Sequence, residues 1–341
     1  MPTLSIIIPV YNVSQYIGRC LQSVFMQQCE EGAVECILVN DCTPDDSMDI
    51  ARRMVAAYDG SIRFVTVGHD VNSGLSAARN TGIAKATGEF VLFIDSDDQL
   101  PEGALQALLG TLKGDEASAT DIVLGNTFLC KSNTQAMTFT EKVPFYVDNS
   151  DEEALRQLLT RRFYHIACNK LVRRSLLGSD TLFERGIVDE DMLWSYLIFR
   201  RTRRVAVVPQ VTYIYEDNPN SIMNTSTEHA ARRIRSRITI CERLLATPPR
   251  QSWREYYMYV FYVLTLAIDV AERSSGVSQQ LKDELFSLRD RFLSLVKSKG
   301  YIMEYLFFLT SRKPFYHINK IRLFRRYYDR IAHLVLAVSK Q

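Results

Sequence analysis

The stretch that most constrains the fold is residues 90–98. Five apolar residues, Phe90 to Ile94, run directly into the acidic sequence Asp95-Ser96-Asp97-Asp98. A short, continuous apolar run is typical of a strand that is buried on both faces, as in a parallel sheet. The acids then follow the carboxyl end of this strand. Ligands bind at that edge of open α/β sheets, so the acids indicate a binding site.

Two interpretations of these acids are open. Carboxylate oxygens are the ligands that Mg²⁺ and Mn²⁺ prefer, which favours a metal site. Alternatively, Asp97 or Asp98 simply caps a helix that begins near Pro101. Taken alone, the stretch fits both interpretations about equally, and the rest of the chain has to decide.

The first 100 residues alternate between two patterns. Three further apolar runs predict strands, at 4–9, 34–39 and 62–67. Apolar residues at helical spacing predict helices between them, at 14–25, 43–55 and 75–85. This alternation predicts an α/β fold with a doubly wound, mostly parallel sheet. Asp41, which follows the second strand, would then share the carboxyl edge with Asp95.

The later pattern is less regular. Strands are expected at 121–125, 205–208 and 211–215, and helices at 151–160 and from Asp189 onward. Residues 126–149 form a hairpin or another ordered excursion, and residues 165–176 favour neither a helix nor a strand. Beyond about residue 225, Arg-rich periodic segments predict helices at 228–246, 251–273, 278–299 and 317–338. We therefore expect two parts, 1–225 and a helical region at 226–341.

Charge is distributed unevenly between these parts. The chain carries a net charge of +2, but residues 1–230 sum to −10 and residues 231–341 to +12. A basic region indicates an anionic partner, such as a membrane surface or nucleic acid, or a helical face that docks on the acidic part. In residues 301–341, aromatic and aliphatic side chains alternate with Lys and Arg, as in an interfacial membrane helix. The same stripe would equally pack on residues 230–300 or on a second subunit.

Cysteine usage and hydropathy bear on the compartment. The seven cysteines are scattered and lack CxxC spacing, which predicts reduced core thiols rather than a zinc site or disulfides. No signal peptide is evident, and no apolar run reaches the ~20 residues that span a bilayer. The prediction is a cytoplasmic protein, located at the inner face of the cell membrane if the tail binds lipid.

Five motifs occur in an ordered series: Ile7-Ile8-Pro9-Val10-Tyr11-Asn12, Val39-Asn40-Asp41-Cys42-Thr43-Pro44-Asp45, Asn72 to Asn80, Asp95 to Asp98, and Glu190-Asp191. Over roughly residues 3–220 this series resembles the family 2 glycosyltransferases, which have the type A nucleotide-sugar-binding fold and are metal-dependent inverting enzymes. The second motif departs from the commoner Asp-Asp-Gly-Ser. Tyr213 to Glu216 lacks the basic residue that many members carry there.

The resemblance assigns roles to individual residues. It implies that the donor nucleotide contacts Pro9, Tyr11, Asn12, Asp41, Gly74, Arg79 and Asp95, with Asp41 accepting a hydrogen bond from the base. Metal ligands are expected at Asp97 and Asp98, with Asp97 as the first choice for direct contact. Asp191 matches the catalytic base, and Glu190 matches its companion near the acceptor.

The function implied is transfer of a sugar from a nucleoside diphosphate donor, expected to be a UDP-sugar, to a hydroxyl of a saccharide or lipid-linked saccharide, as in polysaccharide biosynthesis. Mn²⁺ or Mg²⁺ would be the cofactor. Residues 1–125 would form the donor half and 126–225 the acceptor half of the catalytic domain. Expected partners are donor, acceptor, membrane surface and a second subunit, but not nucleic acid. The alternative is a regulatory module that binds nucleotide sugars without turnover, which the Glu190-Asp191 pair disfavours.

Three more side chains near these motifs have both a structural and a functional interpretation. Trp194 lies one turn beyond Glu190 and is expected in the core rather than as a platform for a sugar ring. His165 and Lys170 could contact acceptor or phosphate, but a structural role fits them equally well.

Overall fold

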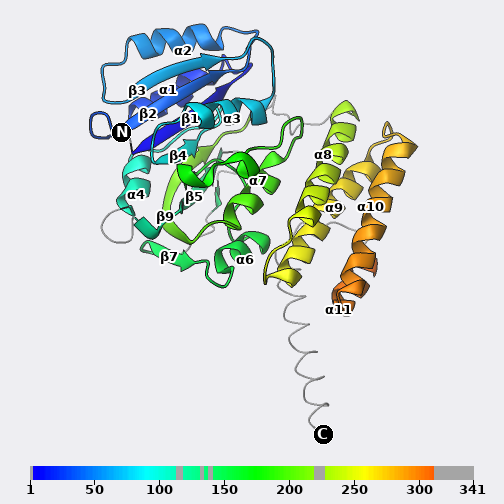
Figure 1. Ribbon diagram of the computed structural model, residues 1–341. Helices are drawn as coiled ribbons and strands as arrows, with labels where there is room; N and C mark the ends of the chain where they lie inside the picture. Colours follow the sequence, from blue (N-terminus) through cyan, green and yellow to red (C-terminus); the bar gives the residue numbers. More distant parts are fainter. Residues whose placement is uncertain (1–2, 113–117, 131–133, 137–140, 219–226, 311–341) are drawn as a thin grey trace. The chain divides into compact units, whose positions relative to one another are not determined.

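The computed structural model describes residues 3–112, 118–130, 134–136, 141–218 and 227–310 (Figure 1). The chain divides into two compact units. The first comprises Met1–Leu155 and His165–Thr225, and the second comprises Arg156–Tyr164 and Ser226–Gln341. The short segment 156–164 thus belongs with the C-terminal helices, although it is flanked by residues of the first unit.

Parallel strands form the first half of the sheet in the first unit (Figure 1). They are β1 (Leu4–Val10), β2 (Val34–Asn40), β3 (Arg63–Gly68) and β4 (Phe90–Phe93), in the spatial order β3-β2-β1-β4. β1 and β2 are almost wholly buried, which explains their continuous apolar sequences. β1 extends through Pro9 to Val10, so the expected end at Pro9 is wrong. Pairing with β4 stops at Ile7, and the missing N–H of Pro9 therefore interrupts no ladder on that side.

The second half of the sheet is mixed. β8 (Lys170–Arg173) lies antiparallel between β4 and β5 (Ile122–Leu129), and β9 (Arg204–Tyr215) follows parallel to β5. β7 (Phe145–Asp148) pairs antiparallel with β9. β6 (Thr134–Ala136) pairs antiparallel with β5. The prediction of a mostly parallel α/β sheet is confirmed. Hairpin pairing of β5 with β6 agrees with one of the two expectations for residues 126–149.

The expected pair of short strands at 205–215 is one continuous strand. β9 passes through Pro209, where its register against β5 shifts. This irregularity is held by two amide side chains. Asn126 Nδ2 donates to Pro209 O at 2.5 Å, and the fully enclosed Asn169 Nδ2 donates to the carbonyls of Gly125 and Asn126 at 2.8 and 3.0 Å. Thr212 donates to Asn169 Oδ1, so one side chain joins β8, β5 and β9.

Helices of the first unit connect these strands. They are α1 (Ile17–Phe25), α2 (Ser47–Ala56), α3 (Leu75–Lys85), α4 (Ala104–Gly110) and α7 (Glu190–Phe199). Helix α6 (Glu153–Leu159) begins in the first unit and passes into the second after Leu155. α3 packs on β1 and β2. α7 is buried on nearly every side, because its side chains from Met192 to Phe199 are almost all apolar. The helix expected from Asp189 onward is therefore a core helix.

The second unit is a helical bundle of α8 (Thr227–Ala246), α9 (Trp253–Arg273), α10 (Gln279–Ser298) and α11 (Ile302–Thr310). α11 joins the bundle through Phe308, which is fully buried and stacks on Phe261 at a centroid distance of 4.2 Å. Glu304, also buried, accepts a 2.9 Å hydrogen bond from Arg254 Nε. The first turns of the aromatic and basic tail thus contribute to the bundle core.

The remaining tail, including the helix predicted at 317–338, lies outside the described residues. Within the described part of the chain, no helix is both long enough and apolar enough to cross a membrane. All seven cysteines are free, as predicted. Four of them are buried, but Cys42 is exposed, so the expectation of seven core thiols is wrong at this position. Cys42 has a left-handed backbone conformation (φ 55°), and its thiol donates to the backbone carbonyl of Asp70 at 3.4 Å.

Gly88 offers a test of the packing between β1 and the start of β4. A Cβ at this position would lie 2.6 Å from Ser5 N and 2.7 Å from Leu4 C, both backbone atoms of a buried strand. Gly88→Ala should therefore lower the free energy of unfolding by ~1–3 kcal/mol, as other overpacked substitutions do. Urea denaturation measures the change.

Gly178→Ala is the matched control, since nothing lies within 4 Å of its added Cβ. Equal stability of the two variants would contradict the close approach at Gly88.

Candidate functional site

The acidic loop that follows β4 does not cap a helix. α4 begins at Ala104 with Gly103 as its N-cap residue, and no side chain caps it. The carboxylates of Asp95, Asp97 and Asp98 are instead held at the carboxyl edge of the sheet. Of the two interpretations of this loop, helix capping is therefore excluded.

Asp98 is the anchor of the loop. It is 2% exposed, and both of its oxygens are engaged: Tyr213 Oη donates to Oδ2 at 2.6 Å and the backbone N–H of Glu216 to Oδ1 at 2.9 Å. Burial, together with the charges of Asp95 and Asp97, raises the pKa of Asp98 to about 8. Tyr213 also accepts a 3.2 Å hydrogen bond from the N–H of Asp95, so the end of β9 fixes the loop at two points.

Asp97 and Asp95 are more open. Asn218 Nδ2 donates to Asp97 Oδ2 at 2.8 Å, and the backbone N–H of Asp97 and the charge of Arg19 also act on this carboxyl. The Asp95 side chain is 31% exposed and uses only Oδ1, toward Arg79. Burial and the neighbouring Asp95 raise the pKa of Asp97. These two residues, rather than Asp98, are the less buried acids of the loop.

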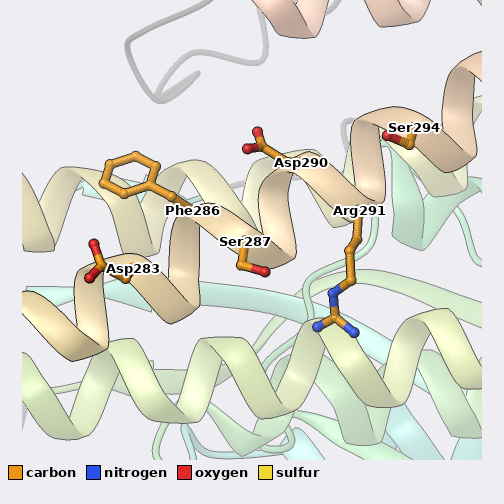
Figure 2. A pocket seen from close by; sticks show the side chains of 6 residues that line it. All are labelled: Asp283, Phe286, Ser287, Asp290, Arg291 and Ser294. Atoms are coloured by element: carbon orange, nitrogen blue, oxygen red, sulfur yellow. The ribbon is translucent and has the colours of Figure 1, made fainter.

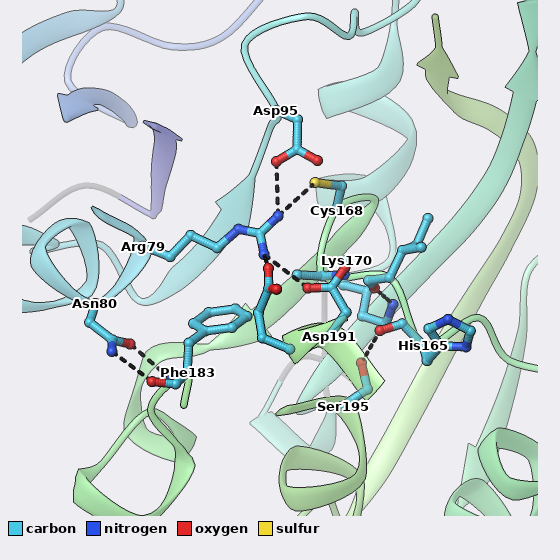
Figure 3. A network of polar contacts seen from close by, with 12 residues as sticks. Arg79, Asn80, Asp95, His165, Cys168, Lys170, Phe183, Asp191 and Ser195 are labelled. Atoms are coloured by element: carbon cyan, nitrogen blue, oxygen red, sulfur yellow. Dashed lines mark hydrogen bonds and ion pairs between the residues drawn. The ribbon is translucent and has the colours of Figure 1, made fainter. Parts of the chain in front are cut away.

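Arg79 joins the acidic loop to the predicted catalytic pair (Figure 3). Its side chain is 1% exposed, and its Nη2 donates to Asp95 Oδ1 at 2.9 Å. Its Nη1 donates to Glu190 Oε1 at 2.7 Å and to Asp191 Oδ1 at 2.9 Å. Residues about a hundred positions apart in the sequence thus meet at one guanidinium.

Glu190 and Asp191 open α7 beside this guanidinium. Burial and the charge of Asp191 raise the pKa of Glu190 to about 7, although Arg79 acts in the opposite direction. Burial also raises the pKa of Asp191, opposed by Arg79. The second oxygen of Asp191 accepts the N–H of Ala167 at 3.0 Å. Both carboxyls are therefore oriented, and their pKa values lie nearer neutrality than in water.

Asp41 organises the loop that precedes α3. It is 2% exposed and accepts the N–H groups of Ser73 and Gly74 at 2.8 Å each, at the N-terminus of α3. His69 Nδ1 lies 2.7 Å from the same carboxylate, and His69 Nε2 lies 2.8 Å from Thr81 Oγ1. Three contacts occupy Asp41, so its predicted contact with a base would have to use its remaining lone pair.

The loop after β1 carries exposed groups. Tyr11 is 44% exposed, and Asn12 adopts a left-handed backbone (φ 55°) whose N–H is bound by Thr43 Oγ1 at 2.8 Å. Asp45 holds the next turn by accepting the N–H of Ser14 at 2.8 Å. Hydrogen bonds to Ser47 and Thr43 keep the pKa of Asp45 far below its usual range. Pro9 is buried within β1, so Tyr11 and Asn12 form the accessible part of the first motif.

Trp194 and Lys170 are buried, and His165 is partly buried. Trp194 is 1% exposed and stacks on Phe183 at 4.6 Å, which confirms it as core. Lys170 is buried and donates to Ile166 O; burial lowers its pKa to about 8, opposed by Asp191. The backbone carbonyl of His165 accepts the hydroxyl of Ser195.

Sequence reasoning missed several residues that shape the site. Tyr213, Asn218 and His69 all bind acids of the sheet edge, and Cys168 Sγ lies 4.0 Å from Arg79 Nη2. Only Tyr213 had a local signal, as one of the aromatics where the family pattern expects a late contact. The partners of the others lie 28 to 121 residues away, beyond any local period.

A hollow in the second unit is a separate feature (Figure 2). It lies along α10, has a volume of about 700 Å³ and is lined by Asp283, Phe286, Ser287, Asp290, Arg291 and Ser294. None of these residues belongs to the five motifs. The candidate catalytic site is therefore the cluster of acids at the carboxyl edge of the sheet.

Comparison with known proteins identifies the family. The sequence profile described as glycosyl transferase family 2 matches residues 5–179, slightly more than half of the chain. The chain belongs to glycosyl transferase family 2. Within this family it is 33% identical over 228 residues to a Bacillus subtilis protein named uncharacterized glycosyltransferase EpsJ, a match that covers 65% of this chain and 63% of that relative. The chain thus spans less than two thirds of that relative's length. Other relatives in Bacillus are named for teichoic acid biosynthesis or as a poly(ribitol-phosphate) glucosyltransferase.

Solved structures show the same type A fold. S. aureus TarS 1-349 in complex with UDP-GlcNAc matches with a TM-score of 0.62 and 19% identity, covering 86% of this chain and 81% of that one. The mannosyltransferase PcManGT of Pyrobaculum calidifontis, in complex with GDP-Man and Mn²⁺, matches with a TM-score of 0.57 and 16% identity, covering 90% and 84%. At these identities the likeness establishes the fold of this glycosyltransferase.

The raised pKa of Glu190 predicts a pH-dependent stability. A carboxyl whose pKa is higher in the folded than in the unfolded state loses stability as pH rises from about 4.5 through about 7. Glu190→Gln removes this loss. In EDTA, the variant should match the wild type near pH 4.5 and exceed it by roughly 1–3 kcal/mol at pH 8, as measured by urea denaturation.

The exposed Glu102→Gln serves as the control and should show no such trend. A Glu190→Gln variant that is less stable than the wild type at pH 8 would mean that an ionised Glu190 stabilises the site.

Proposed function

We propose that this family member is an inverting, metal-dependent glycosyltransferase that moves a sugar from a nucleoside diphosphate, in the first instance UDP, to a hydroxyl of a saccharide or lipid-linked saccharide. One observation carries the proposal. Arg79 holds Asp95 of the acidic loop and the Glu190–Asp191 pair within hydrogen-bond distance of a single side chain. Inverting transfer needs a site for the diphosphate and a base for the acceptor next to each other.

The donor nucleotide is placed over the carboxyl edge of β1 and β2. Tyr11 and Asn12 are the exposed groups there, and Asp41, which follows β2, accepts the N–H groups of Ser73 and Gly74 at the N-terminus of α3. TarS has been solved with UDP-GlcNAc and PcManGT with GDP-Man, so proteins of this fold take either base. UDP is the first choice because Asp41 stands at the position that the family uses to read uracil.

The acidic loop fits a hard divalent ion. Its donors are oxygens only, Asp97 is bound by Asn218 through Oδ2, and Asp95 is partly exposed. Within the described residues no three His, Cys, Asp or Glu side chains form a complete cage, so phosphate oxygens and water would complete the shell. Asp97 would hold Mn²⁺ or Mg²⁺ directly, and Asp98 would keep the loop in position. Such an ion, when bound, neutralises charge on the departing diphosphate.

Asp191 is the proposed base. Its two oxygens are oriented by Arg79 and by the N–H of Ala167, and its partial exposure leaves room for an acceptor hydroxyl. The carboxylate takes the proton of that hydroxyl as its oxygen attacks the anomeric carbon, and the bond to the diphosphate breaks. Glu190 precedes it in the chain and is more deeply buried. Its proposed role is that of a companion to the base near the acceptor.

A regulatory module that binds nucleotide sugars without turnover is the second candidate. It would share the donor residues and the acidic loop. The position of Asp191 at the same guanidinium as Asp95 favours turnover, because a binding module has no need of a second buried acid pair there.

A polymer acceptor is proposed because one relative is named as a minor teichoic acid biosynthesis protein and another as a poly(ribitol-phosphate) beta-glucosyltransferase. Contact with a membrane through the tail, and a homodimer, stay predictions. Residues 311–341, which would carry most of the membrane contact, lie outside the described residues.

Asp97→Ala tests the metal site. In wild-type protein, UDP with Mn²⁺ should raise Tm by a few degrees and UDP with EDTA should not, since a ligand that binds only the native state stabilises it. Asp97→Ala should lose the Mn²⁺-dependent part of this shift. Differential scanning fluorimetry measures both.

The exposed Asp59→Ala is the matched control. An unchanged Mn²⁺-dependent shift in Asp97→Ala would overturn the metal assignment.

Asp191→Asn tests the base. With the nucleotide sugar that gives the largest Tm shift, the variant should bind UDP and Mn²⁺ as the wild type does, while turnover falls ~10²–10⁴-fold, the usual contribution of a general base. Release of UDP, measured in a coupled assay, reports turnover.

A parallel loss of UDP binding would indicate that Asp191 is needed for the fold of the site. Full turnover would place the base elsewhere.

A further inference from the structure

Arg79 is too deeply buried to serve as a simple donor ligand. The family resemblance placed it among the donor-binding residues, yet its side chain is 1% exposed. Its terminal nitrogens are directed at protein carboxylates (Figure 3), and its Nε is enclosed without a hydrogen-bond partner in the described chain. A nucleotide contact would require one of these buried ion pairs to be given up.

The guanidinium instead connects two elements that the proposed reaction needs in register. Nη2 binds Asp95, directly after the strand that carries the acidic loop. Nη1 binds Asp191 and Glu190 in the first turn of α7. A single rigid group therefore spans the diphosphate side and the acceptor side of the site.

The position of this group is itself fixed by packing. Its Cζ lies 5.1 Å from the centre of the Phe183 ring, which stacks on Trp194. Asn80, the next residue of α3, donates to Phe183 O and accepts the N–H of Phe183, both at 2.9 Å. At its N-terminus α3 is held by Asp41. Helix α3 is therefore held at two points, by Asp41 at its N-terminus and by Phe183 through Asn80.

We infer that Arg79 is a positioning residue that holds the base Asp191 in register with the acidic loop and does not contact the donor. This inference rests on the proposed function, in which Asp191 is the base. Arginine suits the task because its planar fork donates in two directions at once, whereas a lysine ammonium is one point charge on a flexible stem.

Arg79 also governs the charge of the base. Burial raises the pKa of Asp191, and Asp95 raises it further, whereas Arg79 and, from β8, Lys170 lower it. Glu190, on the same turn of α7, competes for the guanidinium, and Cys168 lies beside it. Without Arg79, the carboxyls of Asp191 and Glu190 would hold their protons to higher pH.

The test compares Arg79→Lys and Arg79→Gln with the exposed control Arg52→Gln. The first measurement is Tm of full-length protein in EDTA from pH 5 to pH 9. For Arg79→Gln, the loss of Tm relative to wild type should be smallest at pH 5 and should grow toward pH 9, because ionising carboxyls that lack their cation costs stability. A loss that is equal at every pH would mean that Arg79 only fills space, and would overturn the inference.

The second measurement separates positioning from donor binding in Arg79→Lys, the variant that keeps a cation. The affinity for UDP with Mn²⁺, by calorimetry, should stay within about threefold of wild type. Release of UDP from the nucleotide sugar identified above should fall about 100-fold, as a misplaced reacting group does. In Arg79→Gln, which lacks the cation, the acid limb of the pH profile should move to higher pH. Loss of UDP affinity in proportion to turnover would assign Arg79 to the donor and overturn the inference.

Failure of the proposed function would look different. If wild-type protein neither binds UDP with Mn²⁺ nor releases UDP from any nucleotide sugar, the transferase proposal fails. The pH-dependent Tm difference would still report whether Arg79 tethers the carboxyls of α7.

Discussion

A guanidinium enclosed among three carboxylates is the interaction on which the site depends. A charge that is removed from water is tolerated only when it is paired with good geometry, and removal of one partner leaves the other uncompensated. Arg79 is therefore compatible with the fold only if α3, the loop after β4 and the first turn of α7 meet as they do. This requirement makes the placement of the proposed base a consequence of folding.

The other acids of the sheet edge are satisfied mainly by backbone N–H and hydroxyl groups. Asp41 accepts two N–H groups at the start of α3, Asp45 accepts the N–H of Ser14, and Asp98 accepts that of Glu216. The N–H bonds to Asp41 and Asp45 supply no counter-charge, whereas burial and the charges of Asp95 and Asp97 raise the pKa of Asp98 to about 8, so this carboxyl is largely neutral at pH 7. Asp95 and Asp97 are the less buried acids of the loop.

Sequence patterns predicted the parallel half of the sheet well, because buried strands and their helices have distinct periods. Helix α3 begins and ends at the expected residues, Leu75 and Lys85. The mixed half of the sheet was harder to predict from the sequence. β8 contains Lys170, whose charge obscured a buried strand, and β9 continues through Pro209 only because the ladder shifts register there. These features depend on partners such as Asn169, which local propensity does not represent.

The sequence by itself determined the family, the mostly parallel fold and the list of acids at the sheet edge, since motif order and hydrophobic period are local properties of the chain. Only the tertiary structure decided how these acids divide their roles. Asp97 and Asp98 are adjacent in sequence, yet Tyr213 and the backbone of Glu216 occupy both oxygens of Asp98, whereas Asp97 is less buried and is bound by Asn218 through Oδ2. Arg79, which the resemblance assigns to the donor, is enclosed among three carboxylates. The physical reason is burial. A buried charged or polar group needs hydrogen-bond partners, and here several of these partners lie more than a hundred residues away in the sequence. Their contacts determine which carboxylates remain accessible to a ligand.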